Sequence, residues 1–230
     1  MERLRLRPRD AATLIIVDES GTIPKILLGR RSAQLVFMPG KLVFPGGRVE
    51  ADDLALAAGY RLSDVILERL LMQTTSRFGE RHAAAAGLAA IRETFEEAGL
   101  MIGNAAPFAT RREGWRRFAE ASVAPDPAAL VPLARAITPP GPPRRYDTRF
   151  FGVSAERIAF RLPFEERPDL EFDQLGWFSL DALSALELPG ITRQVLSDID
   201  VRLRDGSWRD PSIAMPFYRA RNGRIIRDMI

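Results

Sequence analysis

Hydrophobic positions along the chain fall into short apolar or alternating runs that are separated by turn residues. Runs of this kind, rich in β-branched and aromatic residues, predict β-strands. The predicted strands are residues 12–17, 25–28, 147–153, 158–162 and 176–178, and residues 41–44 are predicted as a short extended piece within a loop. Asn222-Gly223, flanked by residues 217–221 and 224–227, predicts a two-residue hairpin turn.

Other segments place apolar residues at helical spacing. Ser63 is a predicted N-cap for a helix that buries Val65, Ile66, Leu70 and Leu71. A longer helix is predicted from about residue 81, through four consecutive alanines, to Ala98, with Gly99 as its left-handed stop. Further helices are predicted at residues 112–122, 181–186 and 192–201.

Strands and helices mixed in this order predict an α+β fold, arranged as an α/β/α sandwich. The richest turn segment is Pro139-Pro140-Gly141-Pro142-Pro143, yet a predicted strand follows it directly. We therefore interpret the segment as a stiff loop and expect residues 1–230 to form a single domain.

The composition is that of an ordinary globular protein, with 46% hydrophobic and 27% charged residues among 230. No apolar run is long enough to span a bilayer, and the first residues lack the apolar core of a secretory signal. The absence of cysteine excludes disulfides, thiol nucleophiles and thiolate metal sites. The expected location is the cytoplasm.

The net charge is only +3, and Lys25 and Lys41 are the only lysines. Arginine therefore far outnumbers lysine. Arginine favours bidentate contacts with phosphate, although a compositional bias explains the excess of arginine over lysine more simply. Because the arginines are interleaved with acidic residues, no basic stripe predicts nucleic-acid binding.

The most informative chemistry is a cluster of three glutamates, Glu93, Glu96 and Glu97. Positions i, i+3 and i+4 share one helix face, so the three carboxylates repel one another unless a cation neutralises them. A hard divalent cation that prefers oxygen ligands, such as Mg²⁺, suits this face. A solvated acidic face is the alternative. The single histidine, His82, excludes a multi-histidine metal site.

Three sequence features together resemble the Nudix box: Phe44-Pro45-Gly46-Gly47, the acidic Asp53, and the run from Arg92 to Leu100. The resemblance implies a loop and helix that bind Mg²⁺ or Mn²⁺. It implies as metal ligands the carbonyl of Gly47 and the carboxylates of Glu93, Glu96 and Glu97. These glutamates and Arg92, which would pair with a carboxylate of its helix, are the implied catalytic residues.

The chain departs from that pattern at two points. Thr94 stands where an aliphatic residue is usual, and 38 residues separate Asp53 from Arg92 instead of a short spacer. The long spacer leaves open whether Asp53 takes part in the site. Glu93, Glu96 and Glu97 belong to one helix and are unaffected by an insertion that precedes it.

A second resemblance points to the coenzyme A and acyl-coenzyme A diphosphatase branch of the family. It lies in residues 27–33 with Gly40, in the long insertion within the box, and in residues 144–151. Gly29 and Val36 replace a threonine and an arginine of the branch pattern. Residues beside the glycine loop are predicted to contact substrate phosphates: Arg30, Arg31, Arg48 and Gly46. For each of the three arginines, a role at the surface alone is an equal alternative.

The implied reaction is hydrolysis of the pyrophosphate bond in a small-molecule nucleoside diphosphate derivative, foremost coenzyme A or acyl-coenzyme A. ADP-ribose, nucleotide sugars and capped RNA are alternative substrates, and a non-catalytic ligand-sensing module is the alternative outside enzymes. Either Glu93 or a loop carboxylate would be the base. Glu165 and Glu166 are candidates for the loop carboxylate, although a solvated loop is the preferred interpretation. Family members often form homodimers, but the sequence specifies no interface.

Helical insertions are expected at about residues 54–80 and 111–136. Each would expose an apolar face on its own, marked by Ile66 in the first and Trp115 in the second. We therefore expect the two insertions to pack on each other or on a partner subunit, where they would form a cap beside the substrate cleft.

Overall fold

The computed structural model describes residues 6–35, 38–221 and 223–230. The strands are β1 (Arg9–Asp18), β2 (Lys25–Arg31), β3 (Leu42–Val43), β4 (Gly46–Arg48), β5 (Leu100–Ala105), β6 (Val123–Pro125), β7 (Val131–Ile137), β8 (Tyr146–Ser154), β9 (Ile158–Arg161), β10 (Phe172–Ser179), β11 (Pro216–Arg221) and β12 (Arg224–Met229). The α-helices are α1 (Ala51–Leu56), α2 (Asp64–Leu71), α3 (Glu80–Ala98), α4 (Arg116–Glu120) and α5 (Gly190–Asp205). The 3₁₀ turns are η1 (Ala57–Gly59), η2 (Glu113–Trp115), η3 (Pro127–Ala129), η4 (Ala155–Arg157), η5 (Phe164–Glu166), η6 (Leu180–Ala185) and η7 (Ser207–Arg209).

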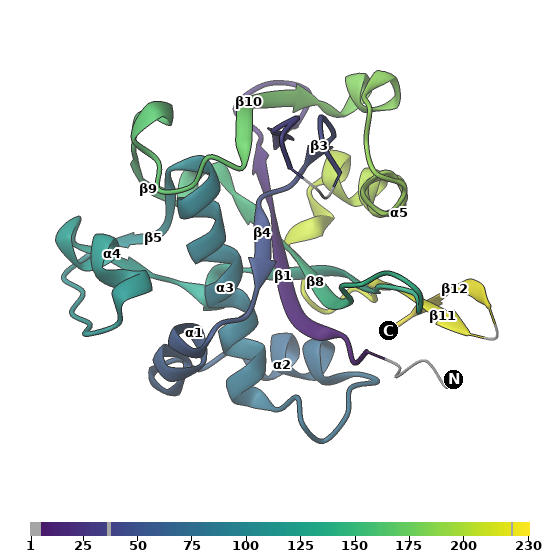
Figure 1. Cartoon of the computed structure of the whole chain (residues 1–230), viewed down its shortest axis with the longest axis horizontal. Helices are drawn as coiled ribbons and strands as arrows, with labels where there is room; N and C mark the ends of the chain where they lie inside the picture. Colours follow the sequence, from purple (N-terminus) through teal and green to yellow (C-terminus); the bar gives the residue numbers. More distant parts are fainter. Residues whose placement is uncertain (1–5, 36–37, 222) are drawn as a thin grey trace.

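A mixed sheet forms the centre of the molecule, with helix α3 on one side and helix α5 on the other (Figure 1). Its strand order is β10-β2-β1-β8-β7-β11-β12, with β3 added to β2 and β4 added to β1. The pairs β1–β8 and β7–β11 are parallel, whereas the other pairs are antiparallel. A smaller sheet has the order β6-β5-β9. The predicted α+β sandwich is confirmed, and its central sheet is mixed.

Strand β1 shows how one sequence pattern builds both layers. Its side chains alternate between the two faces, so Leu14 and Ile16 enter the core beneath α3 while Ile15 and Val17 enter the core beneath α5. All four are fully buried. A central strand with near-continuous apolar residues is therefore covered on both sides.

Helix α3 is the longest helix and packs across the sheet. The alanines at positions 83–86 are buried, which allows close approach of the helix to its neighbours. Gly99 ends the helix with φ of 71°, as predicted. Thr94, which stands where an aliphatic residue is usual, is fully buried. Burial of its hydroxyl is tolerated because the hydroxyl donates to the carbonyl of Ala90 at 2.7 Å.

The first insertion forms helix α2, which packs on α3 and β7. Ser63 caps it as predicted, accepting a hydrogen bond from the backbone N–H of Ile66 at 3.4 Å. Ile66 and Leu70 are buried, but the predicted burial of Val65 is wrong because that side chain lies on the outer face and is 43% exposed.

The second insertion is helical only in its first part. Residues 113–120 form η2 and α4, whereas β6, η3 and most of β7 occupy residues 123–136, so the prediction of a wholly helical segment is wrong. Pro132 does not prevent β7 from joining the sheet because the register shifts between Pro132 and Ala134. Trp115 and Phe118 are fully buried, and Phe118 meets Phe95 of α3 edge-on at 5.4 Å between ring centroids.

The proline-rich segment joins β7 to β8, two neighbouring antiparallel strands, so it is a loop within the sheet. The predicted hairpin near the end of the chain is formed by β11 and β12, with Arg221 opposite Arg224 and Gly223 at φ of 76°. Asn222 and Val36 lie outside the described residues. Among the helices of the described residues, none combines the length and the apolar character that crossing a bilayer requires.

Candidate functional site

The site begins where the glycine loop meets helix α3. Strand β4 pairs with β1 and brings the backbone of Gly46 and Gly47 against the helix, where the N–H of Gly46 donates to Oε2 of Glu97 at 2.9 Å. A Cβ on Gly46 would lie 2.4 Å from the carbonyl oxygen of Ala12, and one on Gly47 would lie 2.3 Å from Oε1 of Glu93. Position 46 therefore requires glycine, because the obstacle there is backbone, whereas a Cβ at position 47 would displace the flexible end of Glu93.

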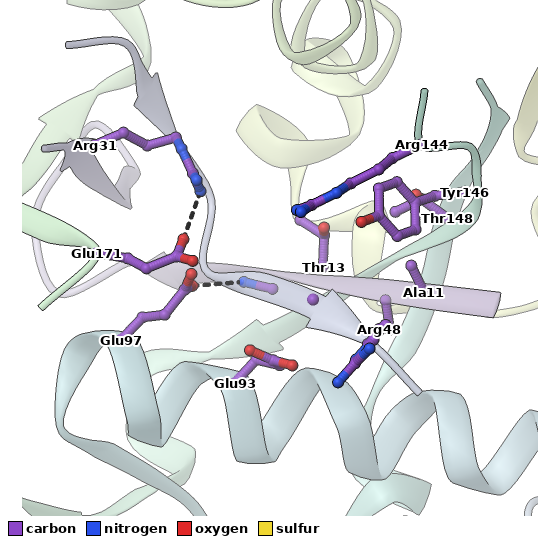
Figure 2. Close-up of a pocket in the computed structure, with 13 residues that line it drawn as sticks. Ala11, Thr13, Arg31, Arg48, Glu93, Glu97, Arg144, Tyr146, Thr148 and Glu171 are labelled. Carbon is purple, nitrogen blue, oxygen red and sulfur yellow. Dashed lines mark hydrogen bonds and ion pairs between the residues drawn. The ribbon is translucent and has the colours of Figure 1, made fainter. Parts of the chain in front are cut away.

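A cavity of about 360 Å³ opens between the glycine loop, helix α3 and the sheet (Figure 2). Both acidic and basic side chains line it. The acidic residues are Glu93, Glu97 and Glu171, and the basic ones are Arg31, Arg48 and Arg144. Neutral lining residues are Ala11, Ala12, Thr13, Gly46, Gly47, Tyr146 and Thr148. Carboxylates on the helix side thus face arginines that come from the loop and the sheet.

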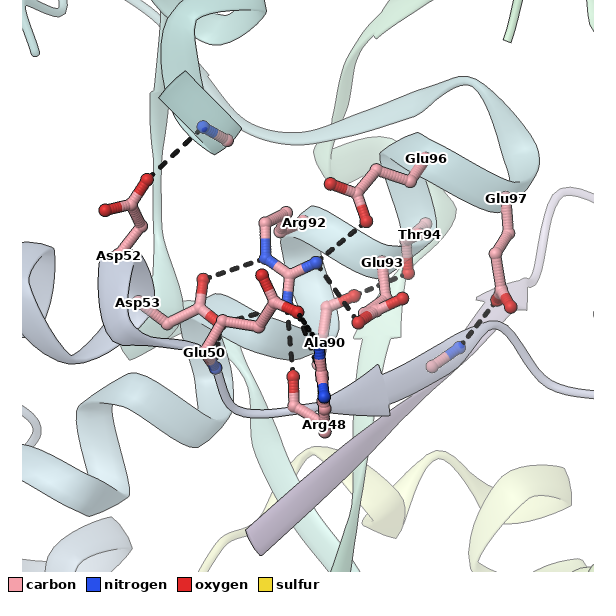
Figure 3. A network of polar contacts seen from close by, with 12 residues as sticks. Arg48, Glu50, Asp52, Asp53, Ala90, Arg92, Glu93, Thr94, Glu96 and Glu97 are labelled. Atoms are coloured by element: carbon pink, nitrogen blue, oxygen red, sulfur yellow. Dashed lines mark hydrogen bonds and ion pairs between the residues drawn. The ribbon is translucent and has the colours of Figure 1, made fainter. Parts of the chain in front are cut away.

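Arg92 links the carboxylates of the loop and helix (Figure 3). Its guanidinium is 3% exposed and makes a bidentate pair with Asp53, with Nε and Nη2 each 3.0 Å from a carboxylate oxygen. Its Nη1 lies 2.7 Å from Oε2 of Glu96 and 3.1 Å from Oε1 of Glu93. Burial lowers the pKa of Arg92, but the hydrogen bond and charge of Asp53, together with the two glutamates, raise it overall.

Asp53 takes part in this network although 38 residues separate it from Arg92. Its carboxylate is fully buried, and Oδ2 also accepts a hydrogen bond from the backbone N–H of Glu50 at 2.9 Å. The inserted segment leaves after α1 and returns at the start of α3, three helical turns before Arg92. Asp53 therefore positions Arg92 and does not line the cavity.

The glutamates of α3 are held in an environment that disfavours their negative charges. Burial raises the pKa of Glu93 to about 7, with Arg92 opposing the shift and Glu96 adding to it. Burial also raises the pKa of Glu97 well above its usual range. The N–H of Gly46, which donates to the carboxylate, opposes the rise, whereas the nearby charges of Glu93 and Glu171 add to the rise. The pKa of Glu96 is raised by burial against the effect of Arg92.

These residues fit a hard divalent cation by their donor chemistry. Within residues 6–35, 38–221 and 223–230, no three acidic or histidine side chains are already gathered in the geometry of a metal centre. Glu93 and Glu97 nonetheless present carboxylate oxygens to one cavity, and a divalent charge would offset their mutual repulsion. Glu96 is turned toward Arg92 and is 29% exposed.

The predicted substrate arginines differ in their contacts. Arg31 and Arg48 line the cavity, Arg31 at 2.7 Å from Oε2 of Glu171 and Arg48 at 2.9 Å from Oε1 of Glu50. Arg30 lies outside the cavity lining and donates to the carbonyl of Gly40 at 3.2 Å, so it holds the loop. A phosphate contact by Arg30 stays a prediction.

Sequence reasoning missed several lining residues. Glu171, and not Glu165 or Glu166, is the loop carboxylate at the cavity; the latter two are exposed in η5. No local motif marks Glu171, which the fold brings to the site. Arg144, Tyr146 and Thr148 belong to the 144–151 segment that carried the second resemblance, so the signal was present without an assigned role.

The loop that bears Glu171 is fastened to the end of helix α3. The N–H of Leu162 donates to the carbonyl of Gly99 at 2.8 Å, and the N–H of Asp169 donates to the carbonyl of Glu96 at 2.9 Å. These bonds satisfy carbonyls that a helix end otherwise leaves without partners.

The expected cap is a wrong prediction for this structure. Helix α2 packs on α3 and also on β7, most of which belongs to the second insertion, so the expected contact between the two insertions is present. Trp115 and Phe118 pack together, and Phe118 packs against Phe95 of α3. Neither segment 54–80 nor segment 111–136 contributes a residue to the cavity at Glu93 and Glu97. The amphipathic patterns indicated that the apolar faces of these helices must be buried, but they did not indicate which part of the molecule buries them.

No protein-family model matches the sequence, and no curated protein shows a significant match. Similar solved structures exist. A NUDIX hydrolase from Alicyclobacillus acidocaldarius is 23% identical, with 86% of this chain and 96% of that chain covered and a TM-score of 0.62. A MutT NUDIX hydrolase from Burkholderia pseudomallei is 17% identical over 84% and 98% of the two chains, with a TM-score of 0.46. The NUDIX domain of Shewanella oneidensis NrtR, solved with ADP ribose, is 10% identical over 88% and 93%, with a TM-score of 0.49. On the strength of the first similarity, this protein has the fold of the Nudix hydrolases.

Proposed function

We propose that the protein is a divalent-metal-dependent hydrolase that cleaves the pyrophosphate bond of a nucleoside diphosphate linked to another moiety. One observation carries the proposal: Glu93 and Glu97 share a cavity with the side chains of three arginines, positions 31, 48 and 144. Hydrolysis of a diphosphate needs both the arginines and the glutamates. The guanidinium groups bind the phosphate oxygens, and the carboxylates would hold the metal that offsets the phosphate charge, so that a water molecule can attack.

Each residue then has a defined task. Glu93, Glu97 and, after a rotation away from Arg92, Glu96 would hold Mg²⁺ or Mn²⁺, with the Gly47 carbonyl as a further ligand. The bound metal would neutralise phosphate oxygens and lower the pKa of a water molecule. Arg92 would keep the carboxylates oriented, since Asp53 fixes its guanidinium on the opposite side.

Coenzyme A or acyl-coenzyme A is the proposed substrate. Support comes from the sequence resemblance in residues 27–33 and 144–151, combined with the presence of Arg31, Arg144, Tyr146 and Thr148 around the cavity. ADP-ribose, nucleotide sugars and capped RNA contain the same bond and are the alternative substrates. The base is proposed to be Glu93 or Glu171, both of which line the cavity.

The test is a panel of coenzyme A, acyl-coenzyme A, ADP-ribose, NADH and nucleoside triphosphates, each assayed with Mg²⁺ and with Mn²⁺. Glu93→Gln and Glu97→Gln are expected to lower kcat by about 100-fold or more, since each removes a charged ligand. Glu113→Gln is the matched control because that side chain is 77% exposed in η2.

Release of 3′,5′-ADP from coenzyme A identifies the proposed substrate, whereas cleavage of ADP-ribose alone identifies the alternative. Wild-type rates in both cavity variants would contradict the assignment of the metal ligands. A protein that binds the panel ligands but hydrolyses none of them would be a ligand-sensing module.

A further inference from the structure

A second cavity, of about 530 Å³, lies on the α5 side of the central sheet. Most of its lining is apolar, and the side chains that shape it come from the glycine loop, from the sheet and from the start of α5. They include Val43, Phe44, Ile137, Phe150, Ile191 and Ile225. We call this space the apolar chamber.

The apolar chamber adjoins the cavity of the glutamates. Thr13, Tyr146 and Thr148 line both spaces. Alternate residues of a strand share a face, so Tyr146, Thr148 and Phe150 follow one another along β8 from the charged cavity into the chamber. Strand β1 runs parallel beside them, with Thr13 opposite Phe150.

The two spaces differ sharply in charge. The first holds three carboxylates and three guanidinium groups. Among the described residues that line the chamber, only Arg219 carries a charge, and its Nη2 is paired with Oδ2 of Asp228 at 2.8 Å. A second phosphate would find there only one cation, which is already paired, whereas an apolar group would gain by leaving water against a mainly apolar lining.

The shape of the chamber favours a chain over a stacked base. Phe44 and Phe150 meet edge-on, with an angle of 81° between their planes and 6.5 Å between their centroids, so they do not form a parallel slot for a flat ring. Ile137, Ile191 and Ile225 complete the wall with aliphatic side chains, which offer no flat surface for a base to stack on.

We propose that the apolar chamber binds an extended apolar chain on the non-nucleotide arm of the substrate, while the diphosphate occupies the cavity of Glu93 and Glu97. The substrate class is then a nucleoside diphosphate with an acyl tail, and the acylated form is preferred to the free thiol. This inference rests on the proposed diphosphate hydrolysis at the same site.

The size of the preference follows from burial. Transfer of one methylene from water to an apolar site raises affinity by about fourfold when burial is complete. kcat/KM is therefore expected to rise from coenzyme A through butyryl- and hexanoyl- to octanoyl-coenzyme A, and to level off once the chain fills the chamber.

The experiment combines kinetics with calorimetric titration of coenzyme A and octanoyl-coenzyme A in the absence of divalent metal. Ile191→Asp places a charge in the wall of the chamber at the first turn of α5, where a carboxylate is compatible with the helix dipole. Val201→Asp is the matched control, since Val201 lies on the same helix and is 70% exposed. Ile225→Asp is a second test at a position that tolerates charge, being 62% exposed at the edge of the chamber.

Both chamber variants are expected to lose at least tenfold in kcat/KM and in affinity for octanoyl-coenzyme A, while values for coenzyme A stay within about twofold of wild type. Hydrolysis that is independent of chain length, or a panel in which ADP-ribose is the best substrate, would overturn the chamber assignment and leave the diphosphatase proposal intact. Chain-dependent binding without hydrolysis would support the chamber and refute the reaction. An absence of binding to every ligand would overturn both.

Discussion

Substitution of Gly47 by alanine tests the site through one contact. The added Cβ would lie 2.3 Å from Oε1 of Glu93, whereas an ordinary contact begins at about 3.4 Å, so the carboxylate must retreat by about 1 Å. A misplacement of that size at a catalytic group costs on the order of 100-fold in rate. We expect kcat to fall by this factor while the thermal midpoint changes little, because Glu93 is 16% exposed and can move toward the cavity.

The assay measures kcat with Mg²⁺ on the best substrate of the panel, alongside Mn²⁺ affinity from electron paramagnetic resonance. Gly59→Ala is the control, since a Cβ there meets nothing within 4 Å. A double-mutant cycle sharpens the result: Gly47→Ala should have no further effect on a Glu93→Ala background, because both changes act through one carboxylate. Equal activity of Gly47→Ala and Gly59→Ala, or additive losses in the cycle, would refute the reasoning.

Three further predictions concern stability. Asp53→Asn removes the bidentate partner of buried Arg92 and should lower the free energy of unfolding by about 3 kcal/mol in urea denaturation. The control Asp52→Asn, at a partly exposed side chain, should change the free energy of unfolding by less than about 0.5 kcal/mol. Equal effects of the two substitutions would contradict the role of Asp53 as the partner of Arg92. The folded protein raises the pKa of Glu93 to about 7, so in the metal-free protein it binds more protons than the unfolded chain between about pH 4.5 and 7, and stability should fall as the pH rises through this window. Glu93→Gln should flatten that fall in thermal melts, and Mg²⁺ should stabilise the wild type more at pH 8 than at pH 5; parallel pH profiles of the two proteins would count against the assignment. Asp147→Asn removes the bidentate carboxylate partner of buried Arg135 and a charge that lies 3.7 Å from buried Arg149, and should cost about 3 kcal/mol by the same denaturation assay; a cost below about 1 kcal/mol would contradict the stabilising role of this carboxylate.

Local patterns in the sequence predicted the part of the site that a single helix carries. Glu93 and Glu97 face one cavity because positions four apart share a helix face, and Gly99 ends α3 because glycine adopts the left-handed conformation. These relations depend on neighbours in the chain, so they survive the long insertion. The pairing of Arg92 with Glu96 is of the same kind.

Contacts between segments that are far apart in the sequence could not be predicted from local patterns. Strand β4 is three residues long and contains two glycines, so it has no strand pattern of its own and exists through its pairing with β1. Glu171 reaches the cavity because the loop before β10 returns to α3, a contact that no spacing in the sequence encodes. The partner of Asp53 was uncertain for the same reason, since the inserted residues hide a contact that the folded chain preserves.

The bonds from Leu162 and Asp169 to the end of α3 have a consequence for motion. They join the loop that carries Glu171 to the helix that carries Glu93 and Glu97, so we expect the loop and the helix to fluctuate together. Carboxylates from separate segments then keep their spacing while the rest of the loop moves. In native-state hydrogen exchange, the amides of Leu162 and Asp169 should open together with the last turn of the helix, as one cooperative unit.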